Sequence, residues 1–215
     1  MNDTTNDIAP RRPLLTHGSL IVLIVSVAYL VGSAWVARRA GNNEFLFYTV
    51  TCVVIALGVA AVHWRVRFST PLLVMLSLWG ALHMAGGLMP VPESWPISGD
   101  QRVLYSWWIW PDGNGSGYFK YDHLVHSLGF GVTTWACWQA LRVGLKDRRP
   151  SLGNVVLCAA AGLGFGAFNE ILEFIATLMG PTNVGGYVNT SWDLVANFAG
   201  ATIAATAIYA FDRKG

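Results

Sequence analysis

Charged side chains are scarce in this chain. Asp, Glu, Lys and Arg together make up 12% of the 215 residues, whereas a soluble domain carries about 25%. So few charges cannot cover a water-exposed surface, and the sequence therefore predicts an integral membrane protein. The net charge of +2 is too small to suggest nucleic-acid binding. No basic run is interleaved with aromatic residues, and we expect no nucleic-acid partner.

Cysteine is also rare and shows no pairing pattern. Cys52, Cys137 and Cys158 each lie singly inside an apolar run, and no CxxC or Cys/His spacing occurs. This arrangement argues against a disulfide scaffold and against a thiolate metal site. We expect the three residues to be small apolar packing groups.

Long apolar runs are abundant instead. Hydrophobic residues make up 53% of the chain, and the mean hydropathy is +0.44. A spanning helix needs about 20 apolar residues. The polar N-terminus lacks a signal-peptide layout, so we expect the first apolar run to be an uncleaved helix. The sequence predicts one all-α membrane domain over residues 1–215, with six transmembrane helices at about 15–37, 44–63, 70–90, 122–143, 151–178 and 192–211.

Basic residues in the loops predict the orientation of this bundle. With a cytoplasmic N-terminus, ten of them lie inside and four lie outside. This positive-inside bias and the even number of spans predict that both termini are cytoplasmic. The inner residues are Arg11, Arg12, Arg65, Arg67, Arg142, Lys146, Arg148, Arg149, Arg213 and Lys214, and the outer ones are Arg38, Arg39, Arg102 and Lys120.

The outer segment 91–120 has a composition of its own, rich in tryptophan, proline and glycine. This mixture is typical of an extramembrane loop whose aromatic rings lie at the membrane interface. Trp107 and Trp108 then belong either to an ordinary interfacial belt or to a lid over a polar site. The sequence leaves both interpretations open.

Polar residues within four of the predicted helices collect near the same outer end. Helices 70–90 and 151–178 run outward, and their polar residues lie near their C-terminal ends. Helices 122–143 and 192–211 run inward, and their polar residues lie near their N-terminal ends. Residues three or four apart share a helix face, so each pair lies on one side of its helix. We expect a single site to contain His83, Asp122, His126, Glu170, Glu173, Asp193 and Asn197.

The four carboxylates of this group would repel one another strongly in a low-dielectric pocket. Protonation would relieve the repulsion, and so would Arg102 and Lys120 folding over the group from the outer loop. One or two divalent cations would do the same, and we favour this solution. Carboxylate and imidazole donors without thiolates suit zinc, manganese, iron or magnesium.

Each residue type suggests a role in such a site. A carboxylate can act as the base, and outer-sphere groups can orient ligands or water. We expect metal ligation by Asp122, His126, Glu173 and Asp193, with His83 next. Base catalysis is assigned to Glu170 or Glu173, the outer sphere to His123 and Asn197, and contact with substrate to Arg102, Lys120, Trp107 and Trp108.

Plainer interpretations of the same residues stay open. His83 can be a hydrogen-bonded core histidine, and Asp122 can be the N-cap of its helix. Asp193 can serve the first turn of the last helix in the same way. Asn197 can simply form a hydrogen bond across helices.

Small residues predict close packing of the last two helices. Gly162 and Gly166 form a GxxxG pattern, and Ala196, Gly200 and Ala204 form a second line of small residues. Such lines let transmembrane helices approach closely. Close packing here would hold the carboxylates of the two helices together.

Three motifs carry a resemblance to a known family. They are Tyr121-Asp122-His123-Leu124-Val125-His126, then Asn169-Glu170-Ile171-Leu172-Glu173, then Gly186 to Asn197 followed by Gly200-Ala201. In this order they resemble the YjdF-like bacterial inner-membrane family and, more distantly, VanZ-like proteins. The chain departs from the expected pattern at Asn189, where an acidic residue is expected. The resemblance implies a multi-pass protein of the bacterial inner membrane and does not name a reaction.

The sequence predicts a metal-dependent membrane enzyme. We expect a hydrolase that acts on a lipid or lipid-linked envelope substrate at the outer leaflet, with membrane lipids as its partners. One alternative is a transporter or proton-coupled channel, which needs ionisable groups along a full path. Another is a non-catalytic lipid-binding or assembly protein whose polar cluster is structural.

Overall fold

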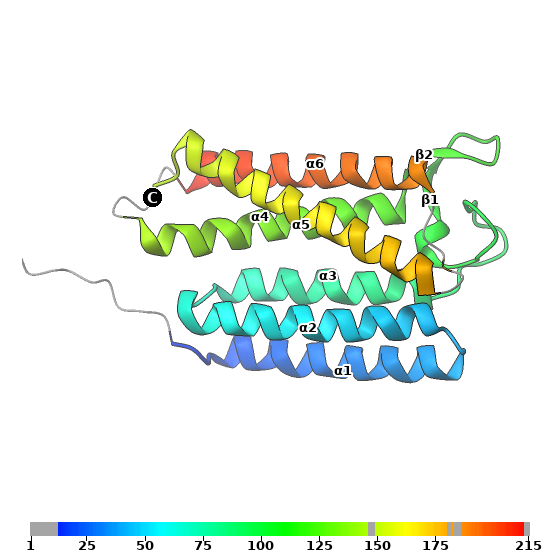
Figure 1. Cartoon of the computed structure of the whole chain (residues 1–215), viewed down its shortest axis with the longest axis horizontal. Coiled ribbons are helices and arrows are strands. Elements are labelled where there is room, and N and C mark those ends of the chain that lie inside the picture. Colours follow the sequence, from blue (N-terminus) through cyan, green and yellow to red (C-terminus); the bar gives the residue numbers. More distant parts are fainter. Residues whose placement is uncertain (1–12, 146–148, 180–181, 183–185, 213–215) are drawn as a thin grey trace, which may run out of the picture.

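The computed structural model describes residues 13–145, 149–179, 182 and 186–212. Its helices are α1 (His17–Arg39), α2 (Asn43–Val66), α3 (Thr70–Leu88), α4 (Tyr121–Gly144), α5 (Leu152–Met179) and α6 (Tyr187–Phe211). The short helix η1 (Leu104–Ser106) and strands β1 (Trp108–Pro111) and β2 (Gly117–Lys120) lie between α3 and α4. The helices run side by side, with α5 oblique across the others, and the strands lie at one end (Figure 1).

Local signals explain where the first helices begin. The Thr16 hydroxyl accepts a 3.0 Å hydrogen bond from the backbone N–H of Ser19 and caps α1. The Asn42 side chain caps α2 through Phe45 N–H at 3.0 Å. Each cap satisfies a donor that the helix itself leaves unpaired. Pro71 lies in the first turn of α3, where no donor is lost.

Five of the described helices, α1, α2, α3, α5 and α6, are long and apolar enough to cross a membrane. Many of their large apolar side chains are exposed, such as Ile24 at 59%, Leu57 at 66% and Ile203 at 68%. Exposure of this kind suits contact with lipid. This finding supports the predicted all-α membrane bundle for five of its six spans.

The helix α4 is the exception, because its composition is more polar. Its 24 residues reach about 36 Å at 1.5 Å per residue, so its length is sufficient. It contacts α2, α3, α5 and α6, and residues such as Phe130, Thr134 and Trp138 are buried. A helix enclosed by other helices needs less apolar surface of its own, which explains the difference.

The start of α6 corrects the predicted boundary. The sequence predicts this helix at 192–211, but it begins at Tyr187. The backbone N–H groups of Asn189 and Thr190 donate to Gly186 O at 2.9 and 3.2 Å. Asn, Thr and Ser compete with helical hydrogen bonds in isolated chains, which is why the segment resembles a loop. The other helices begin and end within three residues of their predicted bounds.

The outer segment contains a hairpin that the sequence does not predict. The strands β1 and β2 pair in antiparallel fashion, with Trp108 opposite Lys120 and Trp110 opposite Phe119. In the connecting turn, Asp112 Oδ1 accepts bonds from the N–H groups of Asn114 and Ser116 at 2.8 and 3.1 Å. The bond from Asn114 is the main reason that the pKa of Asp112 lies below its ordinary value. The hairpin leads directly into α4, so it fixes where that helix starts.

The first turn of α1 and the last turn of α6 lie at the same end of the bundle, opposite the hairpin (Figure 1). Both ends of the helical part of the chain therefore lie on one side of the bundle. The residues that decide the predicted orientation are only partly described, because Arg11, Arg12, Lys146, Arg148, Arg213 and Lys214 lie outside the described residues.

Candidate metal centre

The centre of the site is His126, on the second turn of α4. Its Nε2 atom lies 3.6 Å from Asp122 Oδ1 and 3.8 Å from Glu173 Oε1. Its Nδ1 atom lies 3.1 Å from Asn197 Oδ1 and 3.6 Å from Glu170 Oε1. Three helices, α4, α5 and α6, therefore bring their polar side chains to this one imidazole, as the sequence predicts.

The two ring nitrogens of His126 face different partners and therefore have different roles. With the Asn197 amide oriented so that Oδ1 faces the ring, Asn197 can only accept, and this orientation assigns the proton of a neutral imidazole to Nδ1. In the neutral imidazole, Nε2 then carries the lone pair and points toward Asp122 and Glu173. A ligating histidine usually donates its other N–H in this way.

Asp193 and Asn197 come from α6 and are both fully buried. Asp193 lies in the second turn of α6, so it does not serve the first turn. Asp122 lies in the first turn of α4, where Lys120 holds the N-cap position, so Asp122 is not the N-cap either. Neither plainer interpretation holds for the two aspartates.

Several buried oxygens in this region have no hydrogen-bond partner among the described residues. They are Asp193 Oδ1 and both carboxylate oxygens of Glu170. The 3.6 Å contact between Glu170 and His126 is electrostatic, because it exceeds hydrogen-bond length. An unpaired buried polar group costs about 1–3 kcal/mol, and more when it is charged. As carboxylates these oxygens are acceptors, and a cation, a water molecule or a proton would each satisfy them. Asn197 Nδ2, a donor, also has no partner among the described residues.

Two donor sets meet metal-ligand spacing. One is Asp122, His126 and Asp193, and the other is His126, Glu170 and Glu173. The donor atoms of each set lie within 4.8 Å of one another. Oxygen and nitrogen donors of this kind fit zinc, manganese, iron or magnesium. His126 belongs to both sets.

Lys120 lies over these carboxylates, and its positive charge partly neutralises them. It is 6% exposed, and its Nζ donates to Asp122 Oδ2 at 3.2 Å and to Asn189 Oδ1. Asn189 Nδ2 in turn donates to Asp193 Oδ2 at 2.5 Å. Asn189, where the resemblance led us to expect an acidic residue, thus links the hairpin to α6.

His83 lies beside the cluster and in neither donor set. Its Nδ1 pairs with the Tyr105 hydroxyl at 2.5 Å, and its ring stacks on Trp79 at 5.9 Å between centroids. Burial, with a smaller contribution from Asp122 and Glu173, raises the pKa of Tyr105 well above its ordinary value. The phenol therefore keeps its proton. This geometry agrees with the interpretation of His83 as a hydrogen-bonded core residue.

Three other predicted site residues lie elsewhere. His123 stacks on Trp192 at 6.0 Å between ring centroids. The Arg102 guanidinium donates to the carbonyls of Pro92 and Trp95, at 3.1 and 3.4 Å, and of Glu93. Trp107 packs on Trp95, with 4.3 Å between ring centroids. His123 thus contacts α6, while Arg102 and Trp107 hold the outer segment together. None of the three belongs to a donor set or lines the cavity described below, and their expected outer-sphere and substrate roles stay predictions.

Trp108 lies close to two residues at the start of α4, Lys120 and His123. Its ring centroid lies 6.0 Å from Lys120 Nζ and 6.5 Å from the His123 ring. It therefore helps to position Lys120 from the hairpin side.

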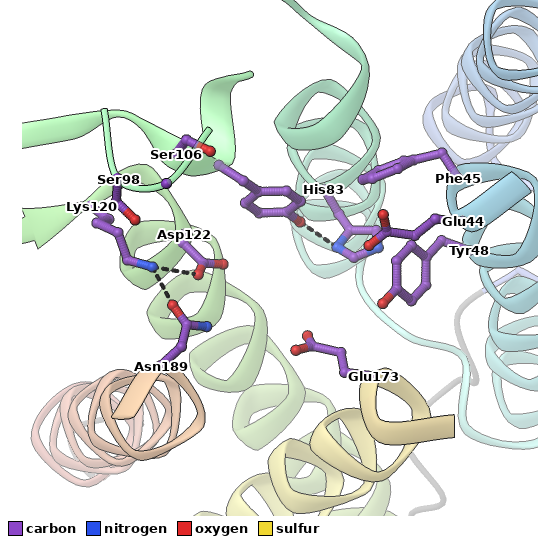
Figure 2. A pocket seen from close by; sticks show the side chains of 12 residues that line it. Glu44, Phe45, Tyr48, His83, Ser98, Ser106, Lys120, Asp122, Glu173 and Asn189 are labelled. Carbon is purple, nitrogen blue, oxygen red and sulfur yellow. Dashed lines mark hydrogen bonds and ion pairs between the residues drawn. The ribbon is translucent and has the colours of Figure 1, made fainter. Parts of the chain in front are cut away.

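A cavity of about 160 Å³ opens beside the cluster. Figure 2 shows Asp122 and Lys120 on one side of it, His83 and Tyr48 on the other, and Glu173 below. Sequence reasoning missed the lining residues Glu44, Tyr48 and Tyr105. Glu44 and Tyr48 are spaced i,i+4 on α2 and share a face, but this spacing alone does not place that face beside the cluster.

Comparison with known proteins supports a membrane assignment. The family model described as "Predicted membrane protein (DUF2238)" matches residues 20–214. No curated protein and no solved structure matches the chain. The match agrees with the YjdF-like resemblance, while the more distant VanZ-like resemblance stays a prediction. With its apolar helices and this match over most of its length, the chain is a multi-pass membrane protein of the DUF2238 family.

Proposed function

We propose that this protein is a metal-dependent membrane hydrolase that acts on a lipid or lipid-linked envelope substrate. The observation that carries the proposal is the arrangement around His126. Its Nδ1 is engaged by Asn197 at 3.1 Å, while its Nε2 faces Asp122 at 3.6 Å and Glu173 at 3.8 Å. In this arrangement the Nε2 lone pair of His126 and the carboxylates of Asp122 and Glu173 face a common position, where a cation would bind.

The metal ligands in this proposal are Asp122, His126 and Asp193, which form one of the two donor sets. A divalent cation supplies a Lewis acid that activates water for attack. Glu173 is the base, because it lines the cavity and its Oε1 accepts a 2.8 Å bond from Asn169 that orients the carboxylate. Glu170 does not line this cavity. Lys120 neutralises Asp122 and offers a positive charge to a developing anion.

The proposal also includes the membrane arrangement. The helix α4 is the sixth span, both termini are cytoplasmic, and the membrane is the inner membrane of a bacterium. The first turn of α1 and the last turn of α6 share one end of the bundle (Figure 1), which supports an even number of spans. The cluster then lies at the outer leaflet, where its cost in hydrocarbon is smaller than at the bilayer centre.

A structural role for the cluster is the second candidate. It is favoured by the contacts from Lys120 to Asn189 and from Asn189 to Asp193, which tie the hairpin to α6. Such a protein would bind lipid or support assembly without turnover.

Glu173→Gln separates the two candidates. We expect the purified protein, reconstituted with manganese or zinc, to hydrolyse one member of a panel of labelled phospholipids and lipid-linked envelope precursors. A chelator abolishes this turnover, and Glu173→Gln lowers it by at least about 100-fold, the range for loss of a general base. The variant keeps the wild-type thermal midpoint. A metal-loaded wild type without turnover on the panel, together with a Glu173→Gln variant that does not fold, favours the structural role.

Asn197→Leu tests how His126 is oriented. Leucine keeps a similar volume and removes the oxygen that accepts the Nδ1 proton. We expect metal affinity to fall 10–100-fold, as for other lost outer-sphere partners, measured by competition with a calibrated chelator. Asn154→Leu, near the start of α5, is the matched control, because the Asn154 side chain makes no hydrogen bond among the described residues, and its backbone N–H donates to Ser151 Oγ. Unchanged affinity in Asn197→Leu would show that Asn197 does not orient the imidazole.

A further inference from the structure

The cavity beside the metal centre contains a buried hydroxyl with no partner. Tyr48 is 6% exposed, and its hydroxyl has no hydrogen-bond partner among the described residues. It lines the cavity together with Phe45 and Glu44 from the same end of α2. Because a buried hydroxyl normally finds a partner, this one indicates a ligand group that the cavity receives.

The α2 side of the cavity offers acceptors and an aromatic ring. Glu44 contributes a carboxylate, Tyr48 contributes its hydroxyl, and Phe45 contributes a ring. Carboxylates, hydroxyl oxygens and ring faces all attract ammonium groups. A primary ammonium group suits this side better than a quaternary one, because only the primary group has N–H donors for Tyr48 and Glu44.

The opposite side of the cavity carries a cation and neutral donors beside one carboxylate. Lys120 and Asn189 line it from β2 and α6, Asp122 lines it from α4, and Ser98 lines it from the outer segment. Lys120 Nζ makes two hydrogen bonds, to Asp122 and Asn189, and an ammonium group has three donors. Figure 2 shows Lys120, Ser98 and Asn189 together, across the cavity from Glu44 and Tyr48. This side suits a phosphate.

We propose that the cavity binds a phosphoethanolamine group, with its ammonium at Glu44 and Tyr48 and its phosphate at Lys120. The inference deepens the proposed function and rests on it in one respect: it makes an ethanolamine phospholipid the substrate class. Binding itself needs no turnover, and can be measured separately. The volume of about 160 Å³ holds a head group but no acyl chain, so the chains stay in the membrane.

Soluble head groups provide the first test. Full-length protein in detergent is titrated calorimetrically with glycerophosphoethanolamine, glycerophosphocholine and glycerol 3-phosphate. We expect the ethanolamine compound to bind at least about tenfold more tightly than the choline compound, the ratio for one lost bond to a charged group. Tyr48→Phe and Glu44→Gln each remove about tenfold of its affinity and leave glycerol 3-phosphate binding unchanged. Tyr118→Phe, whose residue is 68% exposed on β2, is the matched control and changes nothing.

Lipids provide the second test and identify the source of the head group. Protein is reconstituted in nanodiscs with equal parts phosphatidylethanolamine, phosphatidylcholine and phosphatidylglycerol, and retained lipid is measured by native mass spectrometry. Selective retention of phosphatidylethanolamine, lost in Glu44→Gln, assigns the site to a lipid. Selectivity in the soluble titration alone assigns it to a free head group.

Two results overturn the inference. One is equal binding of the ethanolamine and choline compounds together with no enrichment of phosphatidylethanolamine. The other is unchanged selectivity in both Tyr48→Phe and Glu44→Gln. Metal content measured on the same samples keeps the proposals apart. If the protein binds the ethanolamine head group selectively but shows neither bound metal nor turnover, only the hydrolase proposal is rejected. If it shows bound metal and turnover but no selectivity for the ethanolamine head group, only this head-group assignment is rejected.

Discussion

Replacing Glu170 and Glu173 together with alanine is expected to lower the divalent metal content of the purified protein. The wild type should retain metal through purification, and the double variant should retain clearly less. Both carboxylates lie within 4 Å of His126, Glu170 at 3.6 Å and Glu173 at 3.8 Å. Without them, the donor set of His126, Glu170 and Glu173 is lost, whereas the set of Asp122, His126 and Asp193 keeps its three donors. The measurement is elemental analysis by inductively coupled plasma mass spectrometry.

Glu93→Ala is the matched control, because Glu93 is an exposed acid in the outer segment. It should retain the wild-type metal content. Equal and negligible metal in the wild type and the double variant would remove the central hypothesis of this site.

Thermal unfolding adds an independent measurement. A ligand that binds only the folded protein stabilises it, by about 2.7 kcal/mol at a hundredfold excess over Kd. A chelator should therefore lower the midpoint of the wild type by more than that of the double variant. If the cluster binds no metal, its carboxylates only repel one another, and the double variant should unfold at a higher temperature than the wild type.

The convergence of the cluster could be predicted because the helix direction alternates along the chain. Asp122 and His126 come early in α4, Glu170 and Glu173 come late in α5, and Asp193 comes early in α6. Residues at such positions meet at one depth whatever the details of packing. Charged residues are costly inside apolar runs, so their presence there indicates a shared polar site. The helical fold followed from the same runs.

The remaining lining residues could not be predicted because their position depends on tertiary packing. Glu44 in the first turn of α2 suits the helix dipole there, so it needs no further explanation. Tyr105 reaches His83 from an irregular segment whose path no periodicity describes. Arg102 has carbonyl partners close to it in the chain, and these compete successfully with the more distant carboxylates. Asn189 joins the site only because α6 begins earlier than its polar sequence suggests.

Gly200→Ala is expected to destabilise the whole bundle. A Cβ at Gly200 would overlap the backbone carbonyl oxygen of Ser127, and it would lie 2.9 Å from Ser127 Cα. On the other side of the contact, a Cβ at Gly131 would lie 3.0 Å from Gly200 O. The backbones of α4 and α6 therefore touch directly. Because backbone cannot turn aside as a side chain can, the added methyl group must push the helices apart.

The expected cost is about 3 kcal/mol, the upper end for overpacking. For a chain of this size it corresponds to a midpoint lowered by roughly 8 °C, measured by thermal unfolding in detergent. Gly164→Ala is the matched control on α5, where a Cβ meets nothing within 4 Å. Helix propensity makes this control neutral or slightly stabilising. Equal midpoints for the two variants would show that α4 and α6 do not lie in backbone contact.

The same variant connects packing to the site. Ser127 follows His126 directly on α4, and Gly200 lies three residues after Asn197 on α6. The close approach at Gly200 is therefore what allows the 3.1 Å contact between His126 Nδ1 and Asn197 Oδ1. Gly200→Ala should lower metal affinity about as much as Asn197→Leu, without changing any polar group. If Gly200→Ala lowers the midpoint and leaves metal affinity intact, the imidazole is held by α4 and α5 alone.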